Sequence, residues 1–195
     1  MHYGYIEHSE RHIDIVSKRA GEILQTLGYS KDRVELAKIA GYMHGIGKCV
    51  NRVEYAHSGA ILAYNILKDL GMPSEDRTEI MMAIGAHEEK ADSVVSDISA
   101  ALILADKSDV HKSRVTKKNI STFDLNDRLN YTVSNADLII DEENRKVRLD
   151  LTIDTKICPV LDYFEIFMDR AVMSKSAAKY LNIGFELVIN DTKLL

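Results

Sequence analysis

The sequence predicts an α+β protein, with an all-helical domain over residues 1–116 followed by a small ββαβ unit over residues 117–195. Two patterns support this prediction. In the first unit, apolar residues recur at intervals of three and four, as on the buried face of an amphipathic helix. In the second unit, apolar and polar residues alternate in short segments, which is typical of half-buried strands. We therefore expect a three-stranded antiparallel sheet packed on one helix.

Two helices are expected in the first part of the chain. An apolar stripe runs over residues 10–27, and Gly28 ends that helix. Ser30 is placed to cap the next helix with its side chain. This second helix ends near His44, because two glycines come soon after and glycine is unfavourable inside a helix.

Three further helices complete the predicted helical domain. One covers about residues 56–70, and the next begins at Pro73 with acidic residues near its positive end. Residues 98–105 are apolar on nearly every face, which predicts a buried central helix. Asp106 then lies at the end of this central helix.

The second unit is expected to contain strands over about residues 131–140, 145–154 and 185–190. A helix from Pro159 to about residue 181 separates the last two strands. An isolated hairpin is marginally stable, so the sheet should pack on this helix. A small sheet also leaves open edges, which makes a homodimer an expected assembly.

Composition limits the classes of partner. The 195 residues carry a net charge of -5 with both signs interspersed, which argues against a protein that binds nucleic acid or an anionic membrane by charge alone. No apolar run approaches the roughly 20 residues that cross a bilayer. Cys49 and Cys158 show neither metal-ligand spacing nor a disulfide framework, which fits a reducing cytosol. We expect a cytoplasmic protein without a nucleic-acid or membrane partner.

Several residues of metal-ligating type lie on or at the ends of the predicted helices. Imidazole and carboxylate groups are ligands that suit divalent transition metals. A single histidine of this kind is more often a surface or hydrogen-bonded core residue, so the prediction depends on the whole set. That set is His12, His44, His57, His87 and Asp106.

Three short segments give this set a recognisable context. Residues 44–48 read His-Gly-Ile-Gly-Lys, residues 57–59 read His-Ser-Gly, and residues 105–107 read Ala-Asp-Lys. Over residues 8–115 this order resembles the HD-domain metal-dependent phosphohydrolases. The hallmark of that family is a His-Asp pair, typically in a His-Asp-Ile-Gly-Lys string. In this chain Gly45 stands where the family has the aspartate.

The resemblance implies a ligand set. It implies that His12, His44 and Asp106 hold the primary divalent metal, which would be Mn, Fe, Mg, Zn or Ni. It also implies that His57 and His87 help to hold a second metal in the members of the family that bind two. Ala86 stands where that family often has another histidine, so a two-metal site lacks expected ligands at two positions, Gly45 being the other.

Two lysines follow motif segments and are the candidate catalytic residues. Lys48 and Lys107 would contact a substrate phosphate as point charges, with Arg114 assisting. The alternative interpretation is that both lysines are solvated surface residues. Carboxylates that might replace the missing ligand are Glu54, Glu88 and Asp109.

The function expected from the resemblance is a metal-dependent phosphohydrolase that acts on a small phosphomonoester or nucleotide. Such a metal neutralises phosphate oxygens and lowers the pKa of a bound water from about 15.7 towards 7. The alternative is a degenerate HD module that binds a metal or a phosphorylated ligand in a regulatory role without turnover, and Gly45 favours it. A third hypothesis is an interaction domain that uses the C-terminal unit as its contact surface.

Overall fold

A computed structural model describes residues 10–51, 53–88, 94–115, 117–157 and 160–195. Over these residues the chain is an α+β protein with seven α-helices, three short 3₁₀ helices and one four-stranded sheet. The helices are α1 (Glu10–Thr26), α2 (Lys31–Met43), α3 (Tyr55–Asp69), α4 (Ser74–Ala86), α5 (Asp97–Ser108), α6 (Leu125–Thr132) and α7 (Val160–Tyr180). The 3₁₀ helices are η1 (Ile46–Cys49), η2 (Lys112–Arg114) and η3 (Ile120–Thr122). The strands are β1 (Val133–Asp141), β2 (Lys146–Ile153), β3 (Gly184–Ile189) and β4 (Thr192–Lys193).

The expected helix boundaries are close to those observed. Gly28 follows α1 with a φ of 79°, a left-handed conformation that glycine adopts easily. The side chain of Ser30 caps α2 by accepting a hydrogen bond from the backbone of Arg33. The start expected at Pro159 and the residue Cys158 lie outside the described residues.

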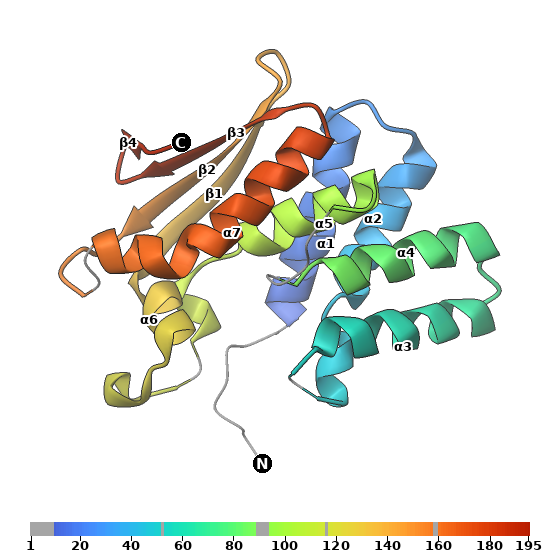
Figure 1. The fold of residues 1–195 in the computed structure, drawn as a ribbon, viewed down its shortest axis with the longest axis horizontal. Coiled ribbons are helices and arrows are strands. Elements are labelled where there is room, and N and C mark those ends of the chain that lie inside the picture. The colour runs from blue at the N-terminus through green and yellow to red at the C-terminus, as the bar shows by residue number, and fades with distance from the viewer. Residues whose placement is uncertain (1–9, 52, 89–93, 116, 158–159) are drawn as a thin grey trace.

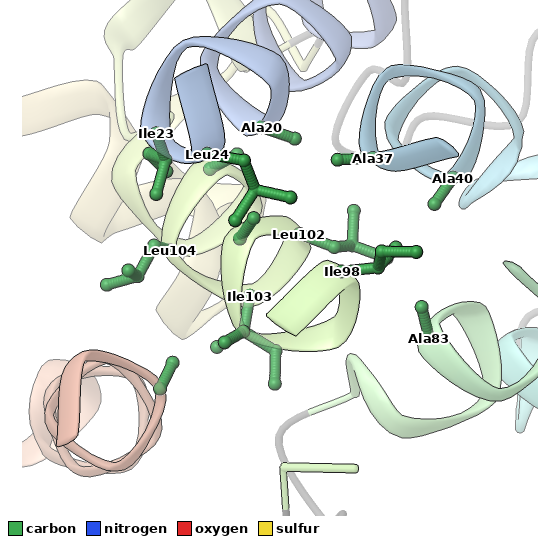
Figure 2. Packing of buried hydrophobic residues seen from close by; sticks show 14 of the residues in the cluster. Ala20, Ile23, Leu24, Ala37, Ala40, Ala83, Ile98, Leu102, Ile103 and Leu104 are labelled. Carbon is green, nitrogen blue, oxygen red and sulfur yellow. The ribbon is translucent and has the colours of Figure 1, made fainter. Parts of the chain in front are cut away.

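Helix α5 lies at the centre of the molecule. It contacts α1, α2 and α4 in the helical bundle and α7 on its other side (Figure 1). Every residue from Ile98 to Ser108 is buried, as the apolar run predicted. Figure 2 shows Ala40 of α2 and Ala83 of α4 pointing toward Ile98 of α5. Small residues on the surrounding helices let their backbones approach α5 closely.

The sheet is mixed, so the expected three-stranded antiparallel sheet is wrong in detail. Strands β1 and β2 are antiparallel, but β2 and β3 are parallel, and a two-residue β4 adds an antiparallel edge. The connection explains the direction, because a strand that returns through a helical crossover such as α7 can lie parallel to the strand it left. In β2 the burial alternates along the strand as expected. Residues 131 and 132 belong to the end of α6 and not to the first strand.

The C-terminal unit shares its core with the helical bundle. Helix α7 packs its Phe167 and Ala171 against apolar residues of the sheet. Its Met173 and Ala177 belong instead to the cluster that contains the side chains of α5. Helix α7 therefore lies between the sheet and the bundle (Figure 1). Among the described residues, no helix has the length and apolar character needed to span a bilayer.

A close contact between two glycines sets the chain after α2 against α3. Gly47 in η1 is buried, and a Cβ at this position would overlap the backbone of Tyr55 and Gly59. A Cβ on Gly59 would lie 3.1 Å from the backbone nitrogen of Gly47, also a tight approach. These glycines therefore serve close backbone packing beside His44.

Gly47→Ala should lower the free energy of unfolding by about 3 kcal/mol or more, because rigid backbone atoms would have to move. Gly85→Ala is the matched control on α4. Its added methyl group would lie 3.7 Å from the Cβ of Ala60, and helix propensity favours alanine by about 1 kcal/mol. Urea denaturation of both variants measures the difference. Equal stabilities would contradict the close-contact role of Gly47.

Candidate metal centre

Three helices bring three of the predicted ligands to one point. His12 lies in the first turn of α1, His44 caps the end of α2, and Asp106 lies in the last turn of α5. Both histidines are fully buried, and Asp106 is nearly so. These three residues form a group whose ligand atoms are close enough to hold a metal ion.

The distances within this group match a metal site. Nε2 of His12 lies 3.2 Å from Nε2 of His44 and 3.3 Å from Oδ1 of Asp106. The third side of the triangle, from His44 Nε2 to Asp106 Oδ1, is 3.7 Å. A point equidistant from these three atoms lies about 2.0 Å from each, which is the length of a zinc–nitrogen bond. The three atoms are therefore spaced so that one ion could contact all of them.

Hydrogen bonds on the far side of each ring determine which nitrogen faces the triangle. His44 Nδ1 lies 2.6 Å from the carbonyl oxygen of Gly41, and His12 Nδ1 lies 2.7 Å from Oδ2 of Asp109. Both partners only accept, so each Nδ1 carries a hydrogen and each ring turns its Nε2 toward Asp106.

The charges of these groups support the same conclusion. Burial lowers the pKa of His44 well below its usual value, so its imidazole is neutral. Burial alone would raise the pKa of Asp106, but Lys107 and the two imidazoles hold it well below its usual value. The Nε2 atoms of His12 and His44 and a carboxylate oxygen of Asp106 thus converge, a set of atoms that could bind a divalent cation.

Lys107 is a buried partner of Asp106, so it is not a solvated surface lysine. Its Nζ lies 2.8 Å from Oδ2 of Asp106, and the residue is 3% exposed. This ion pair occupies one carboxylate oxygen and leaves Oδ1 toward the histidines. Lys48 is half-buried at the edge of the site, with its Nζ 4.1 Å from the ring centroid of Tyr55.

His87 lies beside the triangle but not in it. Its ring centroid is 5.3 Å from that of His44. Its Nδ1 lies 2.5 Å from the carbonyl oxygen of Ile84, and its Nε2 lies 3.3 Å from the hydroxyl of Tyr55. Since Nδ1 carries the hydrogen, the Tyr55 hydroxyl donates to Nε2. Sequence reasoning missed Tyr55, because only the fold shows that it faces this histidine.

His57 is not brought to the cluster. It lies on the first turn of α3 with an exposed side chain, while Ala56, Gly59 and Ala60 take the buried positions of that helix. Glu54 precedes α3 and is also exposed. A role for His57 at a second metal stays a prediction of the family resemblance.

Arginine side chains and Asp109 border the triangle. Asp109 is 2% exposed and contacts His12 on the side of the ring away from Asp106. Nη2 of Arg114 lies 3.4 Å from Nε2 of His12, and its Nη1 donates to the carbonyl oxygen of Asp109 at 2.6 Å. Arg11 approaches the Asp109 carboxylate at 3.4 Å from the half-exposed rim. Asp109 therefore contacts His12 from the outer side and is not one of the three residues that converge.

Comparison with known proteins assigns no family to this site. The chain matches no protein-family model, and a search of curated proteins found no similar sequence.

Asp106→Asn should abolish binding of Mn²⁺, because it removes the only charged atom of the triangle while the amide oxygen can still accept from Lys107. His57→Ala is the control, and its affinity should stay within about twofold of the wild type, because its side chain is exposed. Isothermal titration calorimetry of protein stripped with a chelator measures both. Equal, intact affinity in both variants would show that the triangle does not hold the metal.

Acid should destabilise the metal-free protein partly through His87. Burial lowers the pKa of His87 to about 4, whereas a histidine in an unfolded chain titrates near about 6.5. Below about pH 6.5 His87 binds a proton in the unfolded chain but stays unprotonated in the folded protein until the pH approaches 4. The stabilisation is therefore fully present above that pH and is lost as the pH falls towards 4.

Between about pH 7 and pH 4, the wild type should lose about 3 kcal/mol more stability than His87→Gln. Urea denaturation in the presence of a chelator gives the free energy of unfolding at each pH. His44 contributes to the slope in both proteins, so only the difference between them reports on His87. Parallel curves would contradict a neutral, buried His87.

Proposed function

We propose that this chain is a divergent HD-type metal-dependent phosphohydrolase that acts on a small phosphomonoester or nucleotide. The observation that carries the proposal is the buried triangle of His12, His44 and Asp106, with its three acceptor atoms at metal-site spacing and a guanidinium at its border. A set of two imidazoles and one carboxylate suits a single divalent ion such as Zn, Fe or Ni.

The charges around the triangle support an anionic substrate. Asp106 is the one carboxylate of the ligand set, so a bound divalent ion would keep a net positive charge. Lys107 further offsets Asp106, and Arg114 adds a buried cation 3.4 Å from a ligand atom. A phosphate dianion is the common metabolite group that satisfies a metal and a planar guanidinium together.

Each residue has a distinct role in this proposal. A bound ion would supply a Lewis acid that neutralises a phosphate oxygen and acidifies a water molecule. His12, His44 and Asp106 would hold it, and Lys107 orients Asp106 through one carboxylate oxygen. Arg114 would bind and align the phosphate. Lys48, half-buried at the edge, would attract the substrate as a point charge.

The alternative is binding of a metal or phosphorylated ligand in a regulatory role without turnover. The exposed position of His57 and the absence of a side chain at Gly45 favour it, because the family resemblance implies a ligand at each position, and His57 is the one expected at a second metal. A single ion can still polarise phosphate, so the two functions differ in turnover and not in binding.

The function is tested first by elemental analysis of protein purified without chelator, followed by a turnover screen of phosphomonoesters and nucleotides with Mn²⁺, Fe²⁺ and Zn²⁺. Metal-dependent release of inorganic phosphate supports the hydrolase. Metal and phosphate binding without any release supports the regulatory module. A protein that binds no divalent metal contradicts both.

Arg114→Gln should raise KM for the best substrate at least about tenfold, because it removes a buried charge-assisted contact with phosphate. Metal affinity should stay equal or increase, since a cation beside the ion is lost. Arg128→Gln, on the exposed surface of α6, makes the same chemical change away from the site and should leave KM unchanged. Steady-state kinetics and metal titration give both quantities. A parallel loss of metal affinity would instead indicate that Arg114 supports the fold of the site.

A further inference from the structure

We propose that Asp109 supplies, through the imidazole of His12, the negative charge that Gly45 leaves out of the metal centre. Its role depends on the proposed function, because both concern the same ion. The carboxylate of Asp109 is buried, and its Oδ2 lies 2.7 Å from Nδ1 of His12. Only the five-membered ring separates this charge from the atom that faces the metal position.

The hydrogen bond has two consequences for His12. It holds a proton on Nδ1 and orients the ring so that Nε2 faces His44 and Asp106. A carboxylate that accepts from the outer nitrogen also makes the imidazole a stronger electron donor to a metal. Loss of such a partner typically lowers metal affinity by about 10–100-fold.

The contact distances of the Asp109 carboxylate show that its shortest contact is with His12. Arg11 approaches its carboxylate at 3.4 and 3.5 Å, and Nε of Arg114 lies 3.8 Å away. Both contacts are longer than the 2.7 Å contact with His12. Arg11 is also half-exposed, so solvent screens it. The two arginines therefore orient the carboxylate, while its short hydrogen bond goes to the ligand.

Position 45 explains why this partner matters here. The backbone at Gly45 has φ -90° and ψ -2°, which any L-residue can adopt, so the conformation does not require glycine. The backbone conformation at position 45 thus permits an aspartate next to His44, but the chain carries none. Asp109 is a buried carboxylate that contacts His12 on the side of the ring away from Asp106.

The test compares charge at two positions with Mn²⁺ as the probe. Asp109→Asn keeps the shape and can still accept from Nδ1 through its amide oxygen, so it removes charge alone. We expect calorimetry on the stripped, full-length protein to give an affinity about 10–100-fold weaker than the wild type. Asp14→Asn makes the same change on an exposed position of α1 and should leave the affinity unchanged.

The double variant Gly45→Asp/Asp109→Asn should recover most of the lost affinity, and Gly45→Asp alone should bind Mn²⁺ more tightly than the wild type. Circular dichroism and urea denaturation with chelator check that each variant is folded. Gly45→Asp alone is informative even where Asp109→Asn fails to fold. If Gly45→Asp does not raise the affinity for Mn²⁺, the proposal that Asp109 supplies a charge missing at position 45 is overturned.

The remaining outcomes separate this role from the proposed function. A wild type that binds Mn²⁺ and an Asp109→Asn variant that binds equally well would overturn the role of Asp109 and leave the metal centre intact. Weaker binding that Gly45→Asp fails to rescue would make Asp109 a structural residue only. A wild type without Mn²⁺ affinity would overturn the metal centre and the role of Asp109 together.

Discussion

The burial of α5 on all sides is the constraint on which the rest of the structure depends. Helices α1, α2 and α4 pack on one side of it and α7 on the other, so it has little freedom to shift or rotate. Asp106 at its end is therefore held at a fixed point. The first turn of α1 and the end of α2 reach the same point because both helices pack along α5. Apolar packing thus positions a group of polar side chains that are not themselves part of the apolar core.

Those polar groups remain buried because each charge has a partner. An isolated ionised side chain in the core would be expensive, but Asp106 faces Lys107, and Asp109 faces His12 and two arginines. The arrangement also explains why a group of residues that could bind a metal is stable inside the core. Lys107 and Asp109 hold the outer atoms of the ligands, so the inner atoms remain directed at one another and at the space between them.

Much of this fold could be predicted from local patterns. Periods of three and four marked α1, an unbroken apolar run marked α5, and strict alternation marked β2, because burial on one face or on all faces imposes these patterns. Strand direction could not be predicted in the same way, because alternation is identical in parallel and antiparallel strands. The edge strand β4 was not predicted. In the structure Asn190 and Asp191, which precede β4, both have positive φ, as in tight hairpin turns, and an Asn-Asp pair suits such a turn.

The site was predictable to a similar extent. Residue type and order selected His12, His44 and Asp106, and the fold brings them together. The same reasoning grouped His57 with them, although one step around α3 decides between a buried and an exposed side chain. The contact of Asp109 with the outer side of His12 depends on how α1 packs against α5 and the chain after it. No local pattern contains that information, because the residues are about a hundred positions apart in sequence.

The composition of the triangle bears on which metal the protein would select. Hard ions such as Mg²⁺ prefer several oxygen ligands in octahedral geometry, whereas imidazole-rich sets suit Zn, Fe and Ni. A carboxylate at position 45 would add oxygen to the set, and glycine leaves it with two nitrogens and one oxygen. A charge supplied through the ring of His12 strengthens a nitrogen ligand and adds no oxygen ligand. The substitution at position 45 and the contact with Asp109 therefore act in the same direction, toward a single ion that is bound mainly through nitrogen.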